Sequence, residues 1–214
     1  MTNETSGDAF GSVVIELQRL CSNKRIQAGG DVIAWLWPQP LAINKIWYGM
    51  TTDGSVPDPA VDNGFGPLTG RHKWYGLPRG TSLLTLASKT PFVIAPHMLA
   101  LELQDSSVAT PSFGNATGNG ANHWKSLTYA QLADAFDKGV ALQPDFGFIN
   151  TDDANLTAFK VHGGKLIHYA GTNDGAIFYQ GSMNYYQRVV AKMGGVSAVQ
   201  DFYRFIIVSG TLDA

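Results

Sequence analysis

The residue best placed to take part in catalysis is Asp174, at the centre of the polar turn formed by residues 172–175. This turn directly follows residues 165–171, an apolar run that is predicted to be a β-strand. In an open α/β sheet, ligands bind and catalytic groups are presented at the C-terminal edge of the strands. A carboxylate at that edge could hold the histidine of a catalytic triad in the required tautomer. The alternative is an aspartate that only shapes the turn before Gly175.

A second set of candidate residues lies in the glycine- and proline-rich segment from residue 47 to residue 80. Its aromatic residues are Trp47, Tyr48, Trp74 and Tyr75. Aromatic faces and the guanidinium of Arg79 suit a ligand that combines a phenolic ring with a carboxylate, so Trp74 and Arg79 are predicted to bind substrate. Aromatic residues in loops also form small satellite cores, and the sequence leaves these two interpretations open.

The elements that would position Asp174 follow one another at the end of the chain. After the strand at residues 165–171, a helix is predicted at residues 182–193. Its apolar residues, spaced to fall on one helical face, are Met183, Tyr186, Val190 and Met193. The glycine pair at 194–195 supplies the left-handed conformation that ends helices. Residues 202–208 are rich in β-branched and aromatic side chains and are predicted to form a buried strand, so the fold class is predicted to be α/β.

The clearest local signal upstream is a capping box formed by Thr128 and Gln131. A helix is predicted to begin there, to run to Lys138 and to stop at Gly139. A shorter helix is predicted at residues 156–161.

The chain is predicted to divide into three parts. Residues 1–41 are left unassigned, and within them Pro38 and Pro40 are expected to end any regular element. Residues 42–150 form a loop-rich, lid-like region in this prediction. Residues 151–214 form the C-terminal strand–helix–strand unit.

Composition and charge narrow the possible functions. With 214 residues, of which 44% are hydrophobic and 15% charged, the chain can bury the core of one large domain or two small ones. A formal charge of −2 without a Lys/Arg cluster argues against nucleic acid as a partner. No window is apolar enough for a membrane helix, and residues 1–6 lack the features of a signal peptide, so localisation is left open. The single Cys21 excludes an internal disulfide, no histidine spacing matches a metal-binding motif, and neither a metal nor a cofactor is predicted.

Several short stretches resemble the tannase/feruloyl esterase family of α/β-hydrolases, in the order in which the family has them. They are residues 45–54, 74–81, 150–153, 163–166, 184–186 and 202–204. The resemblance implies the C-terminal part of such a protein, with the last strands and helices of an α/β-hydrolase sheet and a loop-rich lid segment. It also implies hydrolysis of small aromatic, phenolic esters, with aromatic polyesters as a further option, by a Ser/His/Asp triad in which Asp174 is the acid. Family members are commonly secreted or periplasmic.

The sequence departs from the family pattern at the other triad positions. No serine stands in a Gly-x-Ser-x-Gly elbow, and the nearest run, residues 80–84, has only the leading glycine. Asp213 stands about where the family has its histidine base, and Ala214 stands where the family has a cysteine. The chain is therefore expected to be a truncated carboxylic-ester hydrolase with little activity of its own. The alternative is a non-catalytic module that binds aromatic ligands, or an inactive fragment.

The five histidines are expected to have structural roles. His162 precedes the strand before Asp174, and His168 lies within it. The side chain of His168 is expected to point into the packing of the sheet. His72, His97 and His123 lie in the lid-like region, where each is expected on the surface or hydrogen-bonded within the fold.

Overall fold

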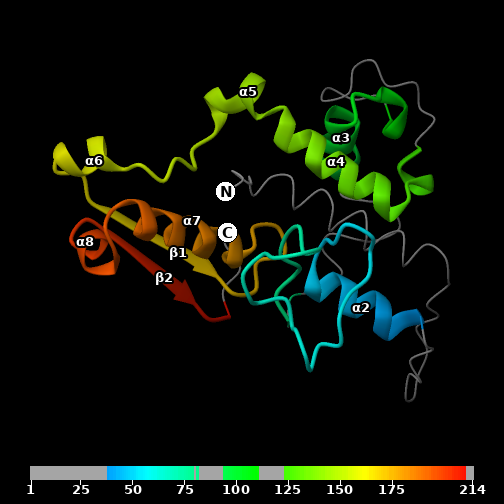
Figure 1. Cartoon of the computed structure of the whole chain (residues 1–214), viewed down its shortest axis with the longest axis horizontal. Coiled ribbons are helices and arrows are strands. Elements are labelled where there is room, and N and C mark those ends of the chain that lie inside the picture. The colour runs from blue at the N-terminus through cyan, green and yellow to red at the C-terminus, as the bar shows by residue number, and fades with distance from the viewer. Residues whose placement is uncertain (1–37, 80, 82–93, 111–122, 211–214) are drawn as a thin grey trace.

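A computed structural model of the chain describes residues 38–79, 81, 94–110 and 123–210 (Figure 1). In these residues, helices α2 to α4 and the loops between them form one group of elements. A C-terminal unit of two strands and helices α6 to α8 forms the other. No helix in the described part of the chain is long and apolar enough to cross a membrane.

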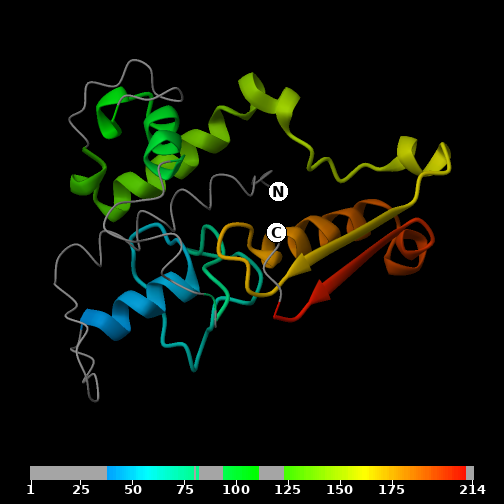
Figure 2. The ribbon, with the colours of Figure 1, turned by 180° about the vertical axis from the view of Figure 1, so that it is seen from behind.

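The C-terminal unit is a small parallel sheet with a helical crossover. Strands β1 (Leu166–Gly171) and β2 (Tyr203–Val208) pair in parallel along their whole length. Between them come α7 (Tyr179–Lys192) and the short α8 (Val196–Gln200). In both views α7 lies along one face of the strands (Figures 1 and 2). The predicted strand–helix–strand unit is confirmed, although α7 begins earlier than residue 182 and α8 is not predicted by the sequence pattern.

A hydrophobic core holds this unit together. Its buried members are Val189, Val199, Phe202 and Tyr203. Three residues of the predicted helical face, Tyr186, Val190 and Met193, pack against this core. Spacing therefore identified the correct side of α7 but missed Val189, its fully buried residue.

Strand β2 is less buried than its composition suggested. Tyr203 at its start is fully buried, but Ile206 and Ile207 are 49% and 44% exposed. A parallel strand is buried on both sides only when helices cover both faces of its sheet. Ile206 and Ile207 point to opposite faces of the strand, so the described elements leave both faces of β2 partly exposed near its end, and the prediction of a buried strand is wrong.

Helix α2 (Pro38–Tyr48) begins with the two prolines that were expected to end a regular element. Proline is tolerated in the first turn of a helix, because the N–H groups of that turn have no acceptor within the helix. The two prolines thus open a helix, and the element that they were expected to end, before Pro38, lies outside the described residues.

The chain after α2 folds back tightly onto the end of this helix. The backbone N–H of Leu77 donates to the carbonyl oxygen of Ile46 at 2.9 Å. Gly49 has a φ of +104°, and a Cβ atom there would lie 2.2 Å from the carbonyl oxygen of Trp74. Only glycine allows this approach between the two backbones.

A second core joins α2 and the loop after it to the rest of the fold. Its buried residues are Ile46, Trp74, Tyr75, Leu77, Phe136 and Phe178. Phe178 directly precedes α7, so the C-terminal unit and the region predicted to be a lid share this core. The division of the chain at residues 41 and 150 stays a prediction.

A third core forms between α3 (Ile94–Glu102), the 3₁₀ turns η1 (Ser106–Val108) and η2 (His123–Ser126), and α4 (Tyr129–Ala141). Helix α4 has the predicted capping box but continues to Ala141, so the predicted stop at Gly139 is wrong. Gly139 is buried inside the helix, where a Cβ atom would lie 3.1 Å from Cγ of Glu102. This glycine serves the packing of α4 on α3.

Replacing Thr128 with alanine should destabilise the fold by about 1 kcal/mol. The Thr128 hydroxyl accepts from the Gln131 N–H at 3.2 Å, and the Thr128 N–H donates to Gln131 Oε1 at 2.8 Å. Losing the first bond lowers the melting temperature by about 2–4 °C for a chain of this size. Thermal unfolding followed by circular dichroism measures the change, with the exposed Thr69→Ala as control. An equal effect of both substitutions would contradict the assignment of the cap.

The connection between the two groups of elements contains α5 (Gln143–Phe146), η3 (Gly147–Ile149) and α6 (Thr157–Val161). Helix α6 confirms the short helix predicted at residues 156–161. Asn155 stands before it, and its Oδ1 accepts from the Thr157 hydroxyl at 2.7 Å.

Candidate functional site

Asp174 lies at the C-terminal edge of the sheet, in the turn between β1 and α7. Its carboxyl group is buried, and Oδ1 accepts hydrogen bonds from the backbone N–H groups of Ala176 at 2.6 Å and Ile177 at 2.9 Å. Among the residues that the structure describes, Oδ2 accepts no hydrogen bond. The carboxylate therefore does shape its own turn, as the simpler interpretation expects. Within the described ranges, its second oxygen has no donor, so it could accept a hydrogen bond from another group.

Two hydrogen bonds tie this turn to the end of β2. The N–H of Thr172 donates to the carbonyl oxygen of Val208, and the N–H of Gly210 donates to the Thr172 hydroxyl, each at 3.0 Å. Gly210, after the end of β2, thus lies beside the turn that carries Asp174. Asp213 and Ala214, the positions where the family resemblance leads one to expect a histidine and a cysteine, lie outside the described residues.

The two predicted substrate-binding residues have different surroundings. Trp74 is only 2% exposed and belongs to the core that contains Leu77 and Phe136. Arg79 is exposed, with its guanidinium 5.1 Å from the ring centroid of Trp47. For Trp74, burial favours the satellite-core interpretation that the sequence left open. A substrate-binding role for either residue stays a prediction.

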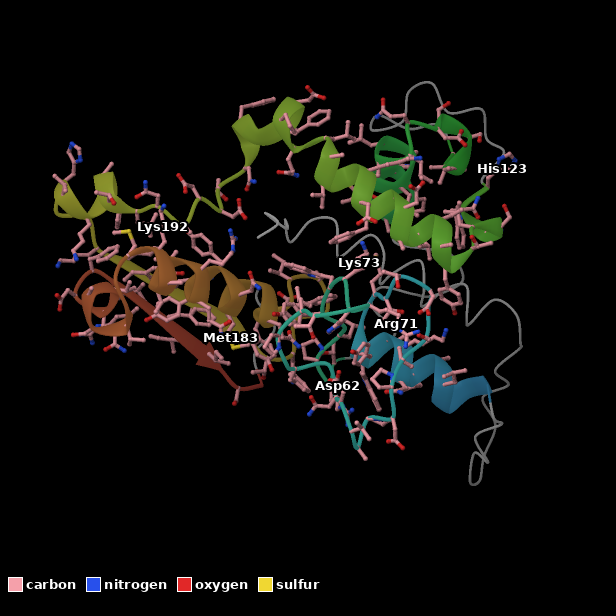
Figure 3. The ribbon with its side chains drawn as sticks, viewed as in Figure 1. Asp62, Arg71, Lys73, His123, Met183 and Lys192 are labelled. Atoms are coloured by element: carbon pink, nitrogen blue, oxygen red, sulfur yellow. The ribbon has the colours of Figure 1, made fainter. Side chains whose placement is uncertain are left out.

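Three of the histidines form hydrogen bonds with groups other than Asp174. Nδ1 of His168 is hydrogen-bonded to the Tyr203 hydroxyl at 2.8 Å, within the packing of the sheet as expected. His162 bonds to the carbonyl oxygen of Ala158 at 2.7 Å, and exposed His123, labelled in Figure 3, lies 3.1 Å from the Ser107 hydroxyl. In the described ranges no histidine contacts Asp174, and no group of three potential metal ligands occurs.

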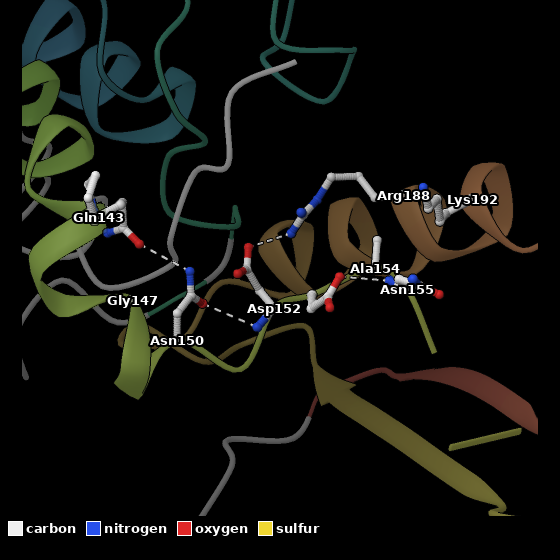
Figure 4. A pocket seen from close by; sticks show the side chains of 10 residues that line it. Gln143, Gly147, Asn150, Asp152, Ala154, Asn155, Arg188 and Lys192 are labelled. Carbon is white, nitrogen blue, oxygen red and sulfur yellow. Dashed lines mark hydrogen bonds and ion pairs between the residues drawn. The ribbon is translucent and has the colours of Figure 1, made fainter. Parts of the chain in front are cut away.

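A pocket of about 440 Å³ opens between η3, the linker before α6 and the last turns of α7 (Figure 4). Arg188 and Asp152 form an ion pair across it at 2.7 Å, and the Asn150 amide donates to Gln143 Oε1 at 3.0 Å. Figure 3 shows Lys192, another lining residue, at the far end of α7 from Met183 and hence from Asp174. The pocket has the volume of a small-molecule site, but about half of its lining is polar, whereas such sites are mostly apolar.

Comparison with known proteins decides the family. The model of the family described as tannase and feruloyl esterase matches residues 65–213. The chain belongs to this family. A probable feruloyl esterase B-2 from Aspergillus fumigatus is 43% identical over 75 residues, which are 35% of this chain and 14% of that protein. A tannase from Aspergillus oryzae is 33% identical over 92 residues, or 40% and 15% of the two chains.

A solved structure supports the fold assignment. The crystal structure of feruloyl esterase B from Aspergillus oryzae matches with a TM-score of 0.53 and 20% identity, over 95% of this chain and 40% of that chain. The predicted partial α/β fold is confirmed at this level. The tannase/feruloyl esterase chain described here thus spans about a seventh of the family proteins matched by sequence and 40% of the solved one.

Sequence reasoning missed two features of this family member. The bond between the Thr172 hydroxyl and Gly210 joins the ends of the two strands, and only a threonine just after a predicted strand could have suggested it. The Arg188–Asp152 ion pair joins α7 to a loop 36 residues away in sequence. No local pattern could have revealed that contact.

The family member should lose stability as the pH falls below about 6.5, because of His72. Burial lowers the pKa of His72, whose Nε2 is hydrogen-bonded to the Tyr48 carbonyl oxygen at 2.9 Å and whose ring stacks on Tyr48 at 4.3 Å. Below the ordinary histidine pKa the unfolded chain takes up the proton first, so the free energy of unfolding falls until the lower folded pKa is passed.

Urea unfolding between pH 7.5 and pH 5 measures this effect. The slope of stability against pH should flatten in His72→Gln and persist in the control His162→Gln. An unchanged slope in His72→Gln would show that other groups cause it. The neighbouring Tyr48 hydroxyl donates to Asp62 at 2.9 Å, and its pKa is raised to about 12, mainly by burial, so it does not titrate in this range.

Proposed function

We propose that this chain supplies the acid of a Ser/His/Asp triad in a carboxylic-ester hydrolase that cleaves esters of aromatic acids. One observation carries the proposal. The Asp174 carboxylate stands at the C-terminal edge of β1 with one oxygen fixed by two backbone N–H groups and the other without a hydrogen bond in the described part of the chain. Membership in the tannase and feruloyl esterase family supports the type of reaction.

The proposed reaction is acyl transfer. A serine hydroxyl attacks the ester carbonyl, a histidine takes up its proton, and Asp174 accepts the Nδ1–H of that histidine and stabilises the imidazolium. The bonds from Ala176 and Ile177 to Oδ1 would fix the direction in which Oδ2 meets the imidazole. The sequence has no Gly-x-Ser-x-Gly motif, so the proposal assigns only the acid of the triad to this chain.

The substrate class follows from the relatives. Their names describe a feruloyl esterase and a tannase, and both point to esters of phenolic acids. The alternative function, non-catalytic binding of an aromatic ligand, has less support, because Trp74 and Tyr75 are 2% and 3% exposed. A ligand could not stack on either ring without opening this core.

A graft tests the proposal. Residues 165–210 replace the equivalent segment of the A. fumigatus relative, and hydrolysis of methyl ferulate is measured with and without Asp174→Asn. Activity that depends on Asp174 is the expected result. A folded graft whose activity is unchanged by Asp174→Asn would refute the role of this residue as the acid of the triad. The chain alone should cleave methyl ferulate no faster than its own Asp174→Ala variant, because a triad works only as a unit.

A further inference from the structure

The pocket beside the last turns of α7 has walls that are fixed by bonds between its own residues (Figure 4). Arg188 joins α7 to the linker through its ion pair with Asp152 at 2.7 Å, and the two side chains are only 25% and 21% exposed. In the linker, Asn150 donates to Gln143 Oε1 at 3.0 Å and accepts from the N–H of Asp152 at 3.2 Å. The protein itself therefore holds both walls in place, which lowers the entropic cost of binding a ligand between them.

The pocket retains hydrogen-bond donors and acceptors that these bonds do not use. Among the described residues, the Lys192 ammonium forms no hydrogen bond or ion pair, and the side-chain NH₂ groups of Gln143 and Asn155 have no acceptor. Of the carboxylate oxygens, only Oδ2 of Asp152 and Oδ1 of Asp153 are bonded in this part of the chain. A ligand hydroxyl donates one hydrogen bond and accepts up to two, so adjacent hydroxyls can use both kinds of group.

The charges of the lining favour a ligand without net charge. Two carboxylates and two cations line the pocket, so their formal charges cancel; they are Asp152 and Asp153, Arg188 and Lys192. An anion would be repelled by the carboxylates and a metal ion by the cations. The described ranges also contain no group of three potential metal ligands. The lining includes the apolar Pro144, which suits the C–H groups of a neutral ligand.

We propose that this pocket binds a neutral compound with several adjacent hydroxyl groups, either a sugar or a cyclic polyol. Lys192 and the Asn155 amide donate to hydroxyl oxygens of the ligand, and Oδ2 of Asp153 accepts from one of its hydroxyls. The pocket is separate from Asp174, because Lys192 ends α7 whereas Asp174 precedes it (Figure 3). A helix of 14 residues is about 20 Å long. The proposal therefore goes beyond the proposed function and holds even if no ester is cleaved.

Titration of the full 214-residue chain followed by amide NMR spectra tests the site. The probes are glucose, xylose and myo-inositol, and at least one of them should bind in the millimolar range or more tightly. The amide signals of residues 150–155 should shift in a saturable manner. Binding of a sugar but not of myo-inositol assigns the ligand to the sugars, and the reverse assigns it to the cyclic polyols. Inorganic phosphate and glycine, titrated as an anion and a zwitterion, should bind at least about tenfold more weakly than the best neutral probe.

Substitutions at two exposed lining positions assign the binding to this pocket. Lys192→Met and Asp153→Asn should each raise Kd by about tenfold, because each removes a hydrogen bond to a charged group. Asp153→Asn keeps the side-chain oxygen that accepts from the Asn155 N–H at 2.9 Å, so the linker should keep its shape. Lys125 is exposed in η2 and does not line the pocket, so Lys125→Met should bind like the unmodified chain.

Three results would overturn the proposal. The first is a folded chain that shows no saturable binding of any neutral probe. The second is binding that neither Lys192→Met nor Asp153→Asn weakens relative to Lys125→Met. The third is tighter binding of phosphate or glycine than of every neutral probe, which would assign the pocket to charged ligands. Circular dichroism of each variant shows that it remains folded, as expected for substitutions at exposed positions.

Discussion

Asp174→Asn should lower kcat for methyl ferulate by about 10⁴-fold in the grafted esterase, which corresponds to about 5.5 kcal/mol of transition-state stabilisation. The amide keeps the size of the carboxylate but carries no charge to stabilise the imidazolium. It also presents an N–H group that favours the wrong histidine tautomer. The two backbone bonds from Ala176 and Ile177 can still reach the side-chain oxygen, so the turn should keep its shape.

A matched substitution distinguishes this effect from a general loss of charge. Asp201 is exposed at the end of α8, and its side chain lies outside the turn that carries Asp174. Asp201→Asn should leave kcat within about twofold of the unmodified graft, as expected for a surface position. The KM for methyl ferulate should change little in Asp174→Asn, because the acid does not touch the ester. A loss of less than about tenfold in kcat would assign Asp174 to the turn alone.

The sequence predicted the C-terminal unit well because its signals are local. The run before Asp174, the spacing of Tyr186, Val190 and Met193, and the aromatic run from Phe202 each depend on near neighbours in the chain. The same holds for the capping box at Thr128. The prediction that α4 stops at Gly139 failed because it depends on a contact between residues far apart in sequence. Gly139 lies inside α4, where it packs on Glu102.

The site was predictable only in part, for the same reason. A strand followed by a turn with an acid was enough to make Asp174 a candidate, and its catalytic role stays a prediction. The lack of a hydrogen bond to Oδ2 among the described residues, and the bond from Gly210 to Thr172, depend on how the turn folds against β2. For Trp74, composition could not show whether the side chain lines a ligand site or belongs to a hydrophobic core, since aromatic residues are common in both. The Leu77 N–H donates a hydrogen bond to the carbonyl oxygen of Ile46, which closes this loop on α2. In the closed loop Trp74 is buried.

Tyr203→Ala should destabilise the C-terminal unit by about 3–5 kcal/mol. Tyr203 is fully buried at the start of β2, packs edge-to-face on Tyr186 with 5.0 Å between ring centroids, and is hydrogen-bonded to His168 at 2.8 Å. Its removal leaves a cavity between α7 and the sheet. Because whole domains are stable by only about 5–15 kcal/mol, this loss should uncouple β1 from β2 near room temperature.

Tyr203→Phe separates packing from hydrogen bonding. It keeps the ring and removes only the hydroxyl that bonds to His168, so it should cost about 1 kcal/mol. Urea unfolding and amide exchange of residues 166–171 measure both variants. The amides of β1 should lose protection in Tyr203→Ala and keep it in Tyr203→Phe, since the parallel pairing depends on the packed ring at the start of β2. If both variants lose the same amount of stability, the hydroxyl and not the ring holds the strands together. The stability of this unit would then depend on the hydrogen bond between Tyr203 and His168.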